Sequence, residues 1–222
     1  MRLTRDHLPK LYARYPIIVG VDEVGRGCLA GRVTAAAMCW RVAGNDTPNP
    51  LPDSKQLDSK QLTANQRQQV VDAIITAGHP HHLASATTEE IDRLNILQAS
   101  LLAMQRAVVA LLGHGLCADK IAVVVDGQQV PILPAPYHQI PLFSLIGGDA
   151  LVPQIAAAST LAKVARDAEM VGLAALHPPY GWDRNKGYGT RAHLQALQTH
   201  GPTVYHRQSF APVRQAIPPH SL

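Results

Sequence analysis

The sequence is poor in charged residues and in cysteine. Asp, Glu, Lys and Arg make up only 16% of the 222 residues, and no long run of like charge occurs, which argues against a disordered chain. The cysteines are odd in number and match no metal-site spacing: Cys28, Cys39 and Cys117. A disulfide-stapled protein is therefore not expected, and a reducing cytoplasmic compartment is the simplest environment for the chain.

Signals for membranes and for secretion are also missing. No stretch approaches the roughly 20 consecutive apolar residues that a membrane-spanning helix needs. The basic N-terminal residues, Met1 to Asp6, are not followed by the apolar segment of a secretory signal. We therefore expect a cytoplasmic protein with no membrane partner.

Apolar residues, in contrast, are plentiful. They make up 46% of the chain, enough for a large core, and no linker divides the sequence. We predict one domain over residues 1–222, with a core at about 15–170 and a helical and loop extension at about 171–222. The net charge of +4, from 20 basic and 16 acidic residues, suits a polyanionic partner but does not require one.

Apolar runs separated by turn residues predict an α/β layer fold with a partly parallel sheet. The strands are expected at 17–21, 33–40, 83–86, 121–125 and 143–146. The helices are expected at 63–76, from 87 or 88 to 112, at 152–176 and at 191–199, with mostly irregular structure after Gly201.

Four carboxylates stand where an apolar run ends or a glycine turn begins: Asp22, Glu23, Asp126 and Asp149. Functional side chains gather at strand ends in open α/β sheets, so these groups can converge. Carboxylates that converge repel one another unless a cation lies between them, and hard ions such as Mg²⁺ or Mn²⁺ prefer oxygen ligands. The pattern therefore favours a divalent metal site.

Two observations keep an alternative open. An aspartate at a strand end before glycine is more often a simple turn former. Adjacent strand residues also point to opposite faces, so Asp22 and Glu23 can share one metal site only if the strand is distorted there. If the carboxylates do converge, they suit two-metal hydrolysis of a phosphodiester, in which one ion activates water and the other stabilises the leaving oxygen.

The run Asp22-Glu23-Val24-Gly25-Arg26-Gly27 resembles the signature of the ribonuclease HII family, the type 2 ribonucleases H. Further motifs in the same order extend the resemblance over nearly the whole chain, at 90–96, 125–127, 148–149, 155–159, 162–167, 180–182, 185–190, His193 and 206–210. The resemblance implies an α/β, ribonuclease H-like fold with a central mixed five-stranded sheet, flanking helices and a C-terminal helical extension. It also implies that Asp22, Glu23, Asp126 and Asp149 are the catalytic metal ligands and that Asp167 is not one.

The resemblance further implies a metal-dependent endoribonuclease that uses Mg²⁺ or Mn²⁺. The expected enzyme hydrolyses the RNA strand of RNA–DNA hybrids, cuts 5′ of single ribonucleotides in duplex DNA, and leaves 3′-hydroxyl and 5′-phosphate ends. The implied substrate-binding residues are Gly25, Arg26, Gly27, Ser59, Lys60, Lys186 and Tyr188. The glycine turn is expected to sense the 2′-hydroxyl, and Tyr188 to pack at the junction between ribonucleotide and deoxyribonucleotide.

The chain departs from the family pattern at two places. An Asp-Ser-Lys motif occurs twice, at 53–55 and 58–60; the second copy fits the family spacing better, which leaves Ser54 and Lys55 as the fallback pair. Gly147 stands where the family usually has a lysine, so one phosphate contact is expected to be missing. Another metal-dependent phosphodiesterase on the same fold remains the alternative function. We expect a monomer, and no clear motif supports a sliding-clamp contact at the tail.

Overall fold

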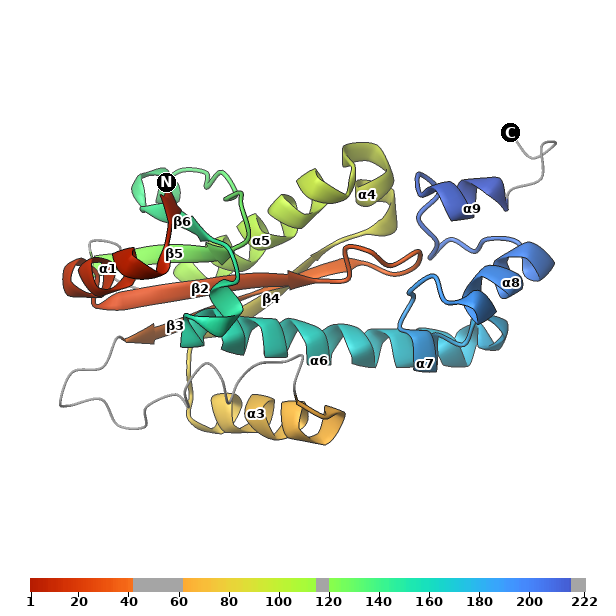
Figure 1. Ribbon diagram of the computed structural model, residues 1–222, viewed down its shortest axis with the longest axis horizontal. Coiled ribbons are helices and arrows are strands. Elements are labelled where there is room, and N and C mark those ends of the chain that lie inside the picture. Colours follow the sequence, from red (N-terminus) through yellow and green to blue (C-terminus); the bar gives the residue numbers. More distant parts are fainter. Residues whose placement is uncertain (42–61, 115–119, 217–222) are drawn as a thin grey trace.

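A mixed six-stranded sheet forms the centre of the protein (Figure 1). The computed structural model describes residues 1–41, 62–114 and 120–216. The strand order is β1-β6-β5-β2-β3-β4; β1, β6, β5 and β2 run parallel, and β3 is antiparallel to both of its neighbours. The strands are β1 (Arg2–Leu3), β2 (Ile17–Val24), β3 (Val33–Arg41), β4 (His81–Ala86), β5 (Ile121–Asp126) and β6 (Leu142–Leu145). All five predicted strands are present, and the two-residue strand β1 adds a sixth.

Two long helices cover the two faces of this sheet (Figure 1). Helix α5 (Ile96–Leu112) packs on the face that carries Val19 and Val21 of β2, and helix α6 (Pro153–Leu176) packs on the opposite face. Gly20 permits the close approach of α6, because a β-carbon there would lie 2.2 Å from the Gln154 carbonyl carbon. This alternation between faces decides where the residues that follow, Asp22 and Glu23, can point.

The segment predicted as one helix up to residue 112 is in fact two helices. Helix α4 (Thr88–Leu94) ends before Asn95, whose φ is +71°, and α5 begins at Ile96. The Asn95 side chain accepts hydrogen bonds from the backbone N–H groups of Leu97 and Gln98, at 3.0 and 3.1 Å. The single-helix prediction was wrong because an asparagine that tolerates positive φ and caps the next helix interrupts the apolar periodicity.

The remaining helices lie around this core. Helix α1 (Leu8–Arg14) and helix α3 (Ala64–Thr76) flank it, and Thr63 caps α3 as predicted. Beyond α6, the short helices α7 (Trp182–Asn185), α8 (Arg191–His200) and α9 (Ala211–Gln215) gather at one end of the sheet (Figure 1). Helices α1, α7 and α9 were not predicted. None of the described helices is both long and apolar enough to cross a membrane.

Candidate active site

The register of two neighbouring strands decides where three of the four predicted carboxylates lie. The parallel pairing of β2 with β5 sets Val21 opposite Val125, so Asp22 and Asp126 come next at the same level. Strand β2 keeps its pairing with β3 through Asp22, Glu23 and Val24. The strand distortion expected for a metal site shared by Asp22 and Glu23 is therefore not present. Asp22 and Glu23 therefore belong to opposite faces of an undistorted strand end.

The three carboxylates nevertheless lie close enough to repel one another. Asp22 is 7% exposed, and its pKa is raised well above the usual range, first by burial and then by the charges of Glu23 and Asp126. A hydrogen bond with the Ser159 side chain opposes this shift. Burial and the charge of Asp126 also raise the pKa of Glu23, against the lowering effect of Arg26. Mutual repulsion of this kind is what a bound cation would relieve.

The fourth carboxylate, Asp149, comes from the turn that fixes Asp126. The 3-10 turn Gly148–Ala150 follows Gly147, whose φ of +64° favours glycine. The Gly148 N–H donates to Asp126 Oδ1 at 2.8 Å, and Asp149 is buried beside it. Gly147 therefore occupies a left-handed position that favours glycine, and the missing phosphate contact expected there stays a prediction.

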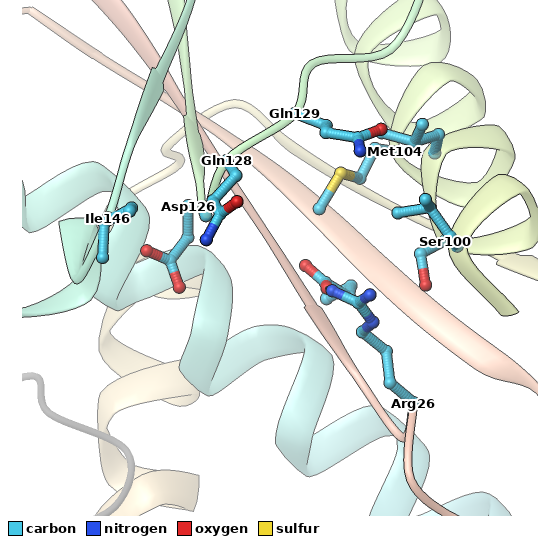
Figure 2. A pocket seen from close by; sticks show the side chains of 11 residues that line it. Arg26, Ser100, Met104, Asp126, Gln128, Gln129 and Ile146 are labelled. Carbon is cyan, nitrogen blue, oxygen red and sulfur yellow. The ribbon is translucent and has the colours of Figure 1, made fainter. Parts of the chain in front are cut away.

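A cavity of about 490 Å³ opens on the α5 side of the strand ends. Glu23, Arg26 and Asp126 supply its charged groups, and Leu97, Leu101 and Met104 of α5 supply an apolar wall. Figure 2 shows Arg26 reaching into the space between Asp126 and the α5 side chains Ser100 and Met104. The Arg26 guanidinium lies 3.0 Å from Glu23 Oε1, so one cation already partly neutralises the cluster.

The donor set of this cluster fits a hard divalent cation, because every candidate ligand is a carboxylate oxygen. Among the residues that the structure describes, no three His, Cys, Asp or Glu side chains are gathered tightly enough to hold an ion as they stand. One oxygen of each strand-end aspartate accepts a backbone N–H: Glu23 donates to Asp22, and Gly148 donates to Asp126. These two bonds hold both aspartates in place before any ion arrives.

Two buried arginines, Arg166 and Arg207, donate hydrogen bonds to backbone carbonyls in and around the Gly25–Gly27 turn. Arg207 donates to the carbonyl oxygens of Gly25 and Arg26, at 2.7 and 2.8 Å. Arg166 donates to the carbonyl oxygens of Ala30 and Lys186, which joins the turn region to the C-terminal segment. Burial lowers the pKa of Arg207 to about 10, yet its guanidinium stays charged at neutral pH. Both arginines lie in recognised motifs, but residue spacing alone gave them no role.

Tyr188 lies beside this turn. An isolated antiparallel bridge pairs Tyr188 with Cys28, and a β-carbon on Gly27 would lie 4.0 Å from Tyr188 Cε1. The tyrosine is 43% exposed, so part of its ring is open to a ligand. Lys186 is also near, but its ammonium donates to the Asp183 carbonyl and it does not line the cavity.

The remaining residues singled out in the sequence are Asp167 and the two Asp-Ser-Lys copies. Asp167 forms an ion pair with Lys163, one helical turn earlier on α6, at 2.8 Å. The Asp-Ser-Lys copies lie outside the described residues, so the roles of Ser59 and Lys60, and of Ser54 and Lys55, stay predictions.

Comparisons with known proteins show what the chain is similar to. The sequence model of the family described as Ribonuclease HII matches residues 19–213. The chain is 47% identical to Ribonuclease HII of Ralstonia nicotianae (strain ATCC BAA-1114 / GMI1000) over 202 residues, 90% of this chain and 79% of the relative. It is 47% identical to Ribonuclease HII of Cupriavidus pinatubonensis (strain JMP 134 / LMG 1197) over 210 residues, 95% of this chain and 90% of the relative.

Two solved structures share the fold at lower identity. The ribonuclease H2 of Pyrococcus horikoshii OT3 superposes with a TM-score of 0.68 at 22% identity, covering 90% of this chain and 96% of that one. Bst-RNase HIII, solved in complex with Mn²⁺, superposes with a TM-score of 0.68 at 19% identity, covering 93% of this chain and 71% of that one. Such identities establish a common fold.

Proposed function

Because the chain belongs to the ribonuclease HII family, the type 2 ribonucleases H, we propose that it cuts RNA–DNA hybrids and duplex DNA on the 5′ side of a single embedded ribonucleotide. The products are 3′-hydroxyl and 5′-phosphate ends. One observation carries the proposal: a rigid glycine turn and a half-exposed tyrosine stand beside the strand end that bears the carboxylates. Recognition and hydrolysis can therefore act on one nucleotide.

The residues that would hold Mg²⁺ or Mn²⁺ are Asp22, Glu23, Asp126 and Asp149. When bound, such ions supply the charge that activates a water and stabilises the leaving 3′-oxygen. The strand-end aspartates keep their positions through backbone N–H bonds, whereas Glu23 shares its Oε1 with Arg26, so an ion held by Glu23 would compete with that pair. An Arg26 side chain freed from Glu23 would be available to a phosphate.

Selectivity for RNA rests on the turn. The carbonyl oxygens of Gly25 and Arg26 face the buried guanidinium of Arg207. The turn therefore cannot rotate its carbonyls outward, and its N–H side is left for a 2′-hydroxyl, which is the group that distinguishes RNA from DNA. The Tyr188 ring beside Gly27 can stack on the next sugar and exclude a second 2′-hydroxyl.

We propose that the protein acts as a cytoplasmic monomer. Lys186 and the Asp-Ser-Lys segment would make further contacts with the sugar-phosphate backbone of the nucleic acid. A protein of the same fold, RNase HII of Archaeoglobus fulgidus, has been solved in complex with PCNA, at 18% identity, with a TM-score of 0.66 and coverage of 86% of this chain and 93% of that one. For this chain no clear sequence motif supports such a sliding-clamp contact, and we do not include one in the proposal.

The first test uses a labelled DNA duplex with one ribonucleotide, incubated with Mg²⁺, Mn²⁺ or EDTA. We expect metal-dependent cutting 5′ of the ribonucleotide by the wild type, and at least about a thousandfold loss with Asp126→Asn, because a neutral amide binds a hard cation poorly. Asp167→Asn is the matched control for the loss of one carboxylate, since Asp167 pairs with Lys163 and is not a proposed metal ligand. An intact duplex beside a cut long hybrid would refute the junction role of the turn and Tyr188.

The alternative function is tested in the same assay. Another metal-dependent phosphodiesterase on this fold would cut an all-DNA duplex of the same sequence. Cutting of that duplex at a rate comparable to the ribonucleotide-containing one would replace our proposal with the alternative.

A further inference from the structure

The C-terminal segment contains a buried polar cluster that the proposed chemistry does not use. His193 and His206 are 0% and 1% exposed, and their Nε2 atoms lie 3.1 Å apart. The indole N–H of the buried Trp182 donates to His193 Nε2 at 3.1 Å. Buried polar side chains with specific partners of this kind fix the geometry of whatever they contact.

The hydrogen bonds determine which nitrogen of His193 carries the proton. Because Nε2 accepts from Trp182, a neutral ring must carry its hydrogen on Nδ1. His193 Nδ1 lies 2.9 Å from the backbone carbonyl oxygen of Tyr188 and therefore donates to it. His206 is fixed in the same way, because its Nδ1 accepts the Thr203 N–H at 2.9 Å, which leaves its Nε2 as the donor toward His193.

Tyr188 is also held at the far end of its side chain. Cys28 is fully buried directly after the Gly25–Gly27 turn, an isolated antiparallel bridge sets it opposite Tyr188, and its thiol is close enough to the phenol to affect the pKa of Tyr188. The neighbouring backbones are tied as well, since the Leu29 N–H donates to the Gly187 carbonyl at 2.7 Å. The tyrosine thus has one anchor on its backbone and a second on its hydroxyl.

We propose that His193 and Cys28 are positioning residues that preset Tyr188 against the Gly25–Gly27 turn and so set selectivity for a single ribonucleotide junction over a long hybrid. The inference rests on the proposed function. A tyrosine ring that is already oriented loses less rotational freedom when a sugar stacks on it, so both anchors lower the cost of binding at the junction. A long hybrid offers ribonucleotides on both sides of the cut and depends less on this ring.

The test compares kcat/KM on a junction duplex and on a long RNA–DNA hybrid for matched variants. His193→Ala removes the donor to Tyr188, whereas His193→Asn keeps an N–H near the position of Nδ1. We expect His193→Ala to lower the junction-to-hybrid ratio about tenfold, the effect of one lost hydrogen bond, and His193→Asn to restore most of it. His200→Ala, at an exposed histidine of the same helix, should leave the ratio unchanged.

Variants of Cys28 test the same proposal a second time, because His193→Ala removes a large buried side chain and a loss of stability has to be separated from a loss of positioning. Cys28→Ala should lower the ratio about fivefold, and Cys28→Ser should recover it through its hydroxyl. Tyr188→Phe combined with Cys28→Ala should be no worse than Tyr188→Phe alone, because both remove the same thiol–phenol contact. Cys39→Ala, at the other described buried cysteine, is the control.

The outcomes are distinct. Equal losses on both substrates that track a lower melting temperature, without recovery by Asn or Ser, would mean a purely structural role and would overturn the inference. Unchanged ratios in the variants would also overturn it while leaving the proposed function intact. A wild type that cuts neither substrate would instead refute the proposed function and the inference with it.

Discussion

At the scale of single residues, the turn that follows Glu23 depends on one glycine more than on the other. Gly25 has a φ of +91°, and a β-carbon there would lie 2.2 Å from Arg166 Nε. That nitrogen donates to the Arg32 carbonyl, so the arginine cannot move aside without breaking a buried bond. Gly27 has neither restriction, because its nearest neighbour would be 4.0 Å away. Backbone conformation and close packing therefore require glycine at Gly25, whereas neither requires it at Gly27.

Gly25→Ala should lower the free energy of unfolding by at least about 2 kcal/mol, since it combines positive-φ strain with a steric clash. Gly27→Ala should change it by less than about 0.5 kcal/mol, because the added methyl enters open space. Urea denaturation of both variants measures the difference. Equal destabilisation would show that the Arg166 guanidinium yields easily and does not define the turn.

At the scale of elements, the strands and long helices followed from hydrophobic periodicity, but their interruptions did not. A continuous apolar run predicted the buried strand β5, and the Ala-rich sequence from Val152 to about Leu176 predicted α6. The break at Asn95 was missed, since asparagine at positive φ looks like any polar helix residue in sequence. The level alignment of Asp22 with Asp126 depends on strand register, which no local pattern encodes.

The candidate site was predicted unevenly for the same reason. The carboxylates, the glycine turn and Tyr188 could be named because each belongs to a local motif. Arg166 and Arg207 could not be assigned a role, because their partners Ala30 and Gly25 lie 136 and 182 residues away in sequence. Contacts between residues so distant depend on how the C-terminal helices pack against the sheet end.

The histidine pair between α8 and the following loop predicts an acid-sensitive region. Burial, then the neighbouring His193 and His177, lowers the pKa of His206 to about 3, and burial lowers that of His193. Both are neutral in the folded protein, whereas an exposed histidine in the unfolded chain has a pKa of about 6.5. Protons therefore bind the unfolded chain first as the pH falls, and the stabilisation is lost between pH 6.5 and about 3.

We expect the free energy of unfolding to fall by up to about 1.4 kcal/mol per pH unit from His206 as the pH drops from 6.5 to 5. This window lies above the range in which Glu90 titrates, because its bond with Arg106 lowers its pKa to about 2. Urea denaturation at several pH values measures the slope, and His206→Gln should flatten it. Parallel slopes for the wild type and the variant would contradict the assignment.

At the scale of the whole molecule, the sheet, the turn and the C-terminal helices bring together groups that destabilise one another without a ligand. Asp22 is buried beside two further carboxylates, and the Arg26 pair offsets only part of that charge. Placing so much negative charge in a buried region costs stability, which is the usual compromise of a preformed binding site. The strands on either side are among the most buried segments, so the carboxylates cannot simply move apart.

This compromise predicts how the folded protein responds to metal. An ion that binds the folded chain alone stabilises it by about 2.7 kcal/mol at a hundred times its Kd, which for a protein of this size raises Tm by about 5 to 10 °C. Asp22→Asn should raise Tm without metal, because it removes one buried charge, and should reduce the shift caused by Mg²⁺ or Mn²⁺. Asp167→Asn should keep the full shift, since that carboxylate pairs with Lys163. Thermal unfolding with and without each ion measures both effects. An equal shift in wild type and Asp22→Asn would place the bound ion away from the end of β2, whatever the nuclease assay shows.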